Sequence, residues 1–223
     1  MVPFDLPEAI VFDLDGTIAD TETVEYQSIS QVWAAHGATY TVAQFVHVIG
    51  TTEGPDWVDE LSAEIGSHVN PAQAHAHRRS VQGELLLTLQ ARPGIRALFE
   101  QASMAGVPMA IASNSPLDWV EARLDHLALR HYLSVLITID IASQPKPHPA
   151  PYLEACAALG APPNRSIALE DSTTGVISAR AAGLYTIACP GPLTQGHDLS
   201  AAHRIIGSHD DLTVADLGRA AQA

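Results

Sequence analysis

The sequence predicts an α/β fold, a Rossmann-like parallel sheet covered by helices on both faces, with an inserted α-helical subdomain. Two observations predict it: short apolar segments alternate with helical patterns along most of the 223 residues, whereas the stretch 21–90 carries helical patterns alone. Strands that alternate with helices form parallel sheets, because each helix carries the chain back across one face of the sheet.

Five segments are expected to form buried strands. Their residues are apolar at nearly every position rather than at alternate positions, which indicates that both faces of the sheet are covered. The predicted strands are 9–13, 107–112, 135–139, 167–169 and 185–188.

Four helices are expected between these strands. Pro93 suits a first helical turn, and Gly160 and Gly183 follow two of the helical patterns as terminating residues. The predicted helices are 93–105, 116–128, 149–159 and 174–182.

The stretch 21–90 is too long for a single crossover between two strands. It holds no convincing buried strand, and its helical patterns cover 23–36, 42–48, 55–65 and 71–90. We therefore expect two domains, an α/β core made of 1–20 and 91–223, and a helical domain made of 21–90.

Composition excludes several classes of protein. Hydrophobic residues make up 47% of the chain and charged residues 16%, which is typical of a folded protein. A net charge of −14 argues against broad binding to nucleic acid or anionic lipid, but one cation with a metal ion can still hold a phosphate. The chain shows no signal-peptide pattern and no membrane-length apolar stretch, so we expect a cytoplasmic protein with no obligate protein partner.

Polar residues follow four of the predicted apolar strands. In a parallel sheet the carboxyl ends of the strands lie at one edge, where ligands bind. The residues expected to converge there are Asp13, Asp15, Thr17, Ser113, Asn114, Ser115, Lys146, Glu170, Asp171 and Ser172.

The four acidic residues of this set, Asp13, Asp15, Glu170 and Asp171, would repel one another without a cation. A hard divalent ion with oxygen ligands, Mg²⁺ above all, resolves that repulsion. A lone Asp-x-Asp is usually a solvated loop, and an isolated Glu-Asp is as easily a helix cap. All four motifs at strand ends, in order, favour one functional site.

The same edge carries groups that suit a phosphate. Lys146 is the only lysine in the chain, and it stands between Pro145 and Pro147. Its ammonium, the Ser113 hydroxyl and the Asn114 amide could meet phosphate oxygens.

These motifs resemble those of the haloacid dehalogenase-like (HAD) superfamily. The residues that carry the resemblance are Phe12–Thr17, Ala112–Asn114, Lys146-Pro147-x-Pro149, and Glu170–Ser172 followed by Gly175. The helical insert resembles the small α-helical cap of the subfamily that contains phosphoglycolate phosphatase and β-phosphoglucomutase. The resemblance thus implies a phosphatase of small phosphorylated metabolites.

The resemblance also implies residue roles. Asp13 would be the nucleophile that forms an aspartyl-phosphate, and Asp15 the general acid and then base. Ligands implied for Mg²⁺ are Asp13, the Asp15 main-chain oxygen, Asp171, and Glu170 directly or through water. Ser113 and Lys146 would hold the phosphoryl group, with Asn114 beside them.

Two alternatives stay open. A β-phosphoglucomutase-like mutase is the first. Such enzymes typically carry a His and an Arg at the two positions that resemble Glu25 and Glu53 of this chain, which counts against a mutase. A receiver-like signalling domain is the second, and the Asp15 acid together with the insert counts against it. We therefore expect hydrolysis of a singly phosphorylated compound whose remaining portion is neutral, hydroxylated or cationic.

Other conspicuous residues are expected to be structural. His75 and His77 are two apart on a predicted helix, so they point in different directions and do not suit a shared metal. We expect Arg78 and Arg79 to be solvated, although one of them could face a substrate anion. The tryptophans 33, 57 and 119 are expected to lie in the core, and the loop 191–197 has no assigned role.

Overall fold

A six-stranded parallel sheet forms the centre of the protein, in the strand order β3-β2-β1-β4-β5-β6. The computed structural model describes residues 6–49 and 56–220. The strands are β1 Ala9–Phe12, β2 Met109–Ala112, β3 Val135–Ile137, β4 Ser166–Glu170, β5 Tyr185–Ala188 and β6 Arg204–Ile205. The predicted Rossmann-like parallel sheet is confirmed.

Strand β1 lies in the middle of the sheet and pairs with β2 on one side and β4 on the other. All four of its residues are fully buried. Ile10 and Phe12 pack into the larger apolar cluster on one face, and Val11 packs into a second cluster on the opposite face. Burial on both faces explains why this strand is continuously apolar in sequence.

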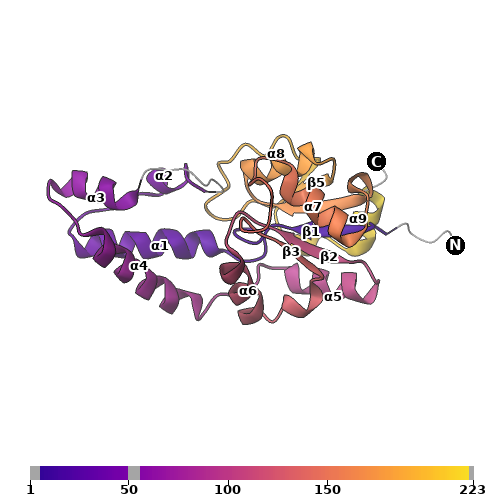
Figure 1. Ribbon diagram of the computed structural model, residues 1–223, viewed down its shortest axis with the longest axis horizontal. Coiled ribbons are helices and arrows are strands. Elements are labelled where there is room, and N and C mark those ends of the chain that lie inside the picture. Colours follow the sequence, from indigo (N-terminus) through magenta and orange to yellow (C-terminus); the bar gives the residue numbers. More distant parts are fainter. Residues whose placement is uncertain (1–5, 50–55, 221–223) are drawn as a thin grey trace.

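Helices cover both faces of the sheet (Figure 1). One face packs against α5, α6 and α9, and the other against α7 and α8. These helices are α5 Ile95–Met104, α6 Leu117–His126, α7 Ala150–Leu159, α8 Thr173–Ala181 and α9 Val214–Ala220. In the part of the chain that is described, no helix has both the length and the apolar character needed to cross a membrane.

In the described part of the chain, four helices between β1 and β2 extend away from the sheet and form the region that we call the helical region (Figure 1). They are α1 Thr21–Ala35, α2 Val42–Phe45, α3 Trp57–Ile65 and α4 Pro71–Leu86. The region has an apolar cluster of its own, which includes the buried Trp33 and Leu61. Val24 of α1 joins the sheet cluster instead. The exact domain boundaries at 20/21 and 90/91 stay a prediction.

Some short elements differ from the sequence expectations. The strands expected at 107–112 and 135–139 are shorter, and β6 and α9 were not predicted. Both residues of β6 are exposed, so it lacks the apolar pattern of a buried strand. Three short 3₁₀ helices complete the fold at Arg130–Tyr132, Pro163–Arg165 and His209–Asp211.

Candidate active site

The predicted site residues meet at the carboxyl edge of the sheet, and all of them except the fully buried Thr17 and Glu170 line one wall of a cavity of about 830 Å³. Asp13 follows β1 directly, Ser113 follows β2, and Glu170 ends β4. The opposite wall belongs to the helical region, which contributes Glu25 among other residues. The two walls are called the core wall and the helical wall below.

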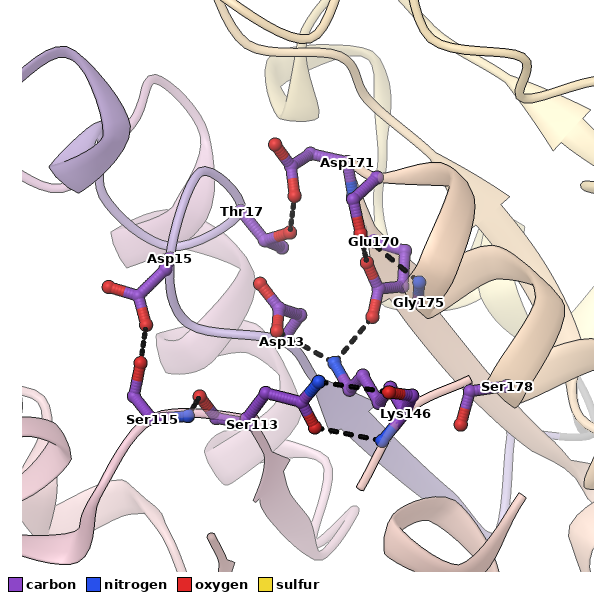
Figure 2. A network of polar contacts seen from close by, with 12 residues as sticks. Asp13, Asp15, Thr17, Ser113, Ser115, Lys146, Glu170, Asp171, Gly175 and Ser178 are labelled. Atoms are coloured by element: carbon purple, nitrogen blue, oxygen red, sulfur yellow. Dashed lines mark hydrogen bonds and ion pairs between the residues drawn. The ribbon is translucent and has the colours of Figure 1, made fainter. Parts of the chain in front are cut away.

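Lys146 forms two buried ion pairs on the core wall (Figure 2). Its Nζ lies 2.7 Å from Asp13 Oδ1 and 2.6 Å from Glu170 Oε1, and only 5% of the residue is exposed. Burial alone would lower the pKa of Lys146, but the carboxylates of Asp13 and Glu170 raise it above its usual value. The lysine is therefore a fixed positive charge.

Asp171 adds a third buried carboxylate beside the two that pair with Lys146. Ligand atoms of Asp13, Glu170 and Asp171 all lie within 4.8 Å of one another, and this is the one such group among the described residues. Burial and the neighbouring carboxylates hold the pKa of Asp13 well above its usual range, although Lys146 lowers it. Burial, followed by Glu170, raises the pKa of Asp171 to about 7. This surplus of buried negative charge, made of hard oxygen donors, fits a divalent cation.

The Asp15 side chain points away from that cluster (Figure 2). Its Oδ1 accepts hydrogen bonds from Thr21 Oγ1 at 2.6 Å and from Trp119 Nε1 at 2.9 Å. Its Oδ2 accepts one from Ser115 Oγ at 2.6 Å. The three hydrogen bonds hold the carboxylate in one orientation. Asp15 could serve a metal only through its main chain in this conformation.

Asn114 holds the loop that carries the lysine. Its Nδ2 donates to the Lys146 carbonyl at 3.1 Å, and its Oδ1 accepts from the Lys146 N–H at 2.8 Å. Both polar ends of the amide are therefore engaged, which differs from the expectation that the amide meets a phosphate. The Asn114 main-chain N–H makes no hydrogen bond to the described residues. Ser113 lies beside it, buried at the cavity.

Two glycines allow the carboxylates to pack so closely. A Cβ on Gly16, whose φ is +83°, would lie 2.2 Å from Asp171 Oδ2. A Cβ on Gly175 would lie 1.9 Å from Glu170 Oε1. Both positions require glycine, since a methyl group would displace a carboxylate of the cluster.

Several residues that the sequence analysis missed support the site. We expected Trp119 to lie in the core. It is instead half-buried at the cavity, where its Nε1 donates a hydrogen bond to Asp15. The loop 191–197 also has a contact with the site, since Thr194 Oγ1 donates to Asp171 Oδ2 at 3.0 Å. Tyr152 donates to Glu170 Oε1 at 2.6 Å. The position of Trp119 in the first turn of the helix after β2 was the available signal.

The helical wall carries an ion pair. Arg78 Nη1 lies 2.6 Å from Glu25 Oε1 and 2.5 Å from Oε2, and Gln82 Nε2 donates to that second oxygen at 2.5 Å. Burial raises the pKa of Glu25 although Arg78 lowers it. Arg78 is therefore not solvated but lines the cavity, which is the alternative that we allowed for one of the two arginines, whereas Arg79 is exposed.

Two further expectations concern the helical region. His75 contacts Trp57 edge-on and lies 3.6 Å from Asp56. Among the described residues, no potential metal group includes either His75 or His77. The position of Glu53, which we compared with the mutases, lies outside the described residues.

A parallel sheet with buried carboxylates and a lysine at its carboxyl edge, facing an inserted helical region, defines a class of α/β phosphate-ester hydrolases. The model of the haloacid dehalogenase-like hydrolases matches residues 7–183. The chain belongs to this family, and it is a phosphatase of small phosphorylated compounds.

Known proteins of similar sequence and structure agree with this assignment. CbbY of Rhodobacter capsulatus is 32% identical over 96% of this chain and 95% of its own. Validoxylamine A 7'-phosphate phosphatase of Streptomyces hygroscopicus is 30% identical over 86% of this chain and 87% of its own. A solved structure of CbbY from Rhodobacter sphaeroides with xylulose-(1,5)bisphosphate is 29% identical over 93% and 96%, with a TM-score of 0.77.

Proposed function

We propose that this protein is a Mg²⁺-dependent phosphatase that hydrolyses a small phosphomonoester through an aspartyl-phosphate on Asp13. The observation that carries the proposal is the buried cluster of Asp13, Glu170 and Asp171, in which Lys146 pairs with the first two carboxylates. Lys146 fixes one oxygen of Asp13, and the other accepts no hydrogen bond from the described residues. That second oxygen is the one that would attack phosphorus.

Mg²⁺ would be held by the carboxylates of Asp13 and Asp171 and the Asp15 main-chain oxygen, with Glu170 directly or through water. When bound it would supply positive charge that offsets the carboxylates and the phosphate. Support comes from the donor set, which is made of oxygens, and from the surplus of buried negative charge.

The remaining steps belong to residues of this chain. Lys146, the Ser113 hydroxyl and the Asn114 main-chain N–H would bind the phosphoryl oxygens. Asp15, once protonated, would give its proton to the leaving oxygen and would then take one from the water that attacks the aspartyl-phosphate. Its side chain is held at the cavity by hydrogen bonds from Thr21, Ser115 and Trp119.

The substrate that we propose carries one phosphate on a neutral, hydroxylated or cationic remainder. Among the described residues that line the cavity, seven carboxylates face three cations. Two of these cations, Lys146 and Arg78, are already paired with carboxylates. A second phosphate would therefore meet an acidic cavity, which also disfavours the mutase alternative.

A phosphate-release screen tests this function. Purified protein is offered a panel of phosphorylated metabolites with Mg²⁺ and, separately, with EDTA. We expect release from one or several sugar or polyol phosphates with Mg²⁺ and none with EDTA. Activity that survives EDTA would rule out the metal requirement. Efficient conversion of β-glucose 1-phosphate to glucose 6-phosphate with little free phosphate would make the mutase alternative right.

A further inference from the structure

We propose that Glu25 masks Arg78, and that this ion pair is the specificity determinant by which the cavity rejects substrates with a second phosphate. The inference rests on the proposed phosphatase function and deepens it. It concerns charges of the helical wall, so it can be tested by binding, without turnover on the core wall.

The hydrogen bonds of the pair engage both oxygens of Glu25 but only part of the Arg78 guanidinium. Glu25 lies on α1, and Arg78 and Gln82 lie one turn apart on α4, on the face that meets α1. Both oxygens of Glu25 are engaged, by Arg78 Nη1 and by Gln82. Arg78, by contrast, uses only Nη1, and its Nη2 and Nε make no hydrogen bond to the described residues. All three side chains line the cavity.

The pair is sheltered enough for its charge to matter. The side chain of Arg78 is 19% exposed and that of Glu25 is 30% exposed, so salt screens them less than a surface pair. Arg78 is the cation of the described helical wall, whereas Lys146 and Arg123 belong to the core wall. Lys146 is paired twice, and the Arg123 guanidinium stacks 4.2 Å above the Trp119 ring.

The fold itself accommodates two phosphates, since the related CbbY structure contains a bisphosphate. In this chain Glu25 neutralises the charge of Arg78, so a phosphate at the end of the substrate remote from Asp13 would meet an ion pair rather than a free cation. A phosphate that binds the remaining Nη2 and Nε donors would also lie near the Glu25 carboxylate, and like charges at close range repel. Removing Glu25 should therefore release a cation already positioned in the cavity.

A double-mutant cycle tests this inference with one matched pair of ligands, fructose 1-phosphate and fructose 1,6-bisphosphate. Dissociation constants are measured by calorimetry with Mg²⁺ in an Asp13→Asn background, which prevents turnover. Glu25→Gln should shift the preference toward the bisphosphate about tenfold, the size of one new charge-assisted contact. In an Arg78→Gln background the same Glu25→Gln change should produce little shift.

Controls separate this effect from a general change of charge. Glu84→Gln and Arg79→Gln alter exposed residues of the same helix α4 and should leave the preference unchanged. Circular dichroism and melting temperature establish that each variant is folded. If Glu25→Gln is unfolded, the milder Gln82→Leu, which removes only one partner of Glu25, should show a smaller shift in the same direction.

Two outcomes would overturn the proposal. One is an unchanged preference in a folded Glu25→Gln variant, including failure to bind the bisphosphate. The other is an equal shift with and without Arg78, which would indicate loss of repulsion rather than release of a cation. If the double-mutant cycle gives the expected shift but the enzyme with Asp13 intact releases phosphate from no compound, the proposed function is wrong. The inference that Glu25 masks Arg78 would still hold.

Discussion

The core wall and the helical wall of the cavity are built differently. On the core wall the groups proposed for catalysis are held by several partners: Lys146 binds two carboxylates, and Asp15 accepts three hydrogen bonds. Arg123 is the exception on this wall, since its Nη1 is buried without a hydrogen-bond partner. On the helical wall Glu22 makes no hydrogen bond to the described residues, and Glu60 Oε2 is buried without a partner. The core wall is thus preorganised for one reaction, and the helical wall keeps polar groups that a substrate can use.

The largest effect should come from the core wall at Asp13. Asp13→Asn preserves size but removes the attacking charge, so turnover should be lost while the fold remains. Steady-state phosphate release, compared with a mock purification, and circular dichroism check this prediction. Activity above the mock level would exclude the covalent mechanism.

Lys146 should rank second on the core wall. Lys146→Ala leaves Asp13 and Glu170 without their buried partner and should lower kcat/KM about a hundredfold or more. An independent readout exists because Lys146 is the only lysine in the chain. Phosphate with Mg²⁺ should protect it from amine-directed labelling. A labelling rate that saturating phosphate leaves unchanged would show that Lys146 does not bind the phosphoryl group.

A substitution of Trp119 tests whether the core wall also holds Asp15, the proposed general acid, in position. Trp119→Phe keeps the aromatic ring but removes the N–H that holds Asp15 Oδ1, and Arg123 can still stack on it. We expect kcat to fall about tenfold with little change in KM, the size of an effect on positioning rather than on the acid itself. The control is Trp33→Phe, which alters a buried tryptophan of the helical region that is not part of the cavity lining. Equal losses in both variants would mean that Trp119 matters for folding rather than for Asp15.

Glu22 tests the helical wall and should give the smallest effect. Burial, and then Asp15, hold the pKa of Glu22 well above its usual value. A carboxyl whose pKa is raised on folding costs stability as pH rises above its unfolded value, and the cost is absent at lower pH. Glu22→Gln should therefore raise the melting temperature by a few degrees at pH 8 in EDTA, and not at pH 4.

The exposed Glu84→Gln is the matched control for this measurement. A melting temperature that rises equally for both variants at pH 8 would show that net charge is responsible. A Glu22→Gln variant no more stable than the parent at pH 8 would contradict the raised pKa. Either result would contradict the inference that the helical wall, unlike the core wall, holds a buried carboxylate without a partner.

The core wall of the site was predictable because local sequence patterns mark the residues that form it. Asp13, Ser113 and Glu170 each follow or end a continuously apolar strand, and parallel pairing brings strand ends to one edge. The same logic predicted both covering layers of helices. It did not predict β6, because an exposed two-residue strand at the edge carries no apolar pattern.

The sequence by itself therefore determined the sheet, its helical insert and the collection of carboxylates, lysine and serine at one edge. Only the tertiary structure decided which side chains pair. Glu25 and Arg78 are 53 positions apart, and Asp15 and Trp119 are 104 apart. No local pattern connects such residues, because their contact depends on how helices pack and on which rotamers that packing leaves open. The chemistry of the site is thus visible along the chain, whereas the shape and charge of the cavity depend on the packing of the helices.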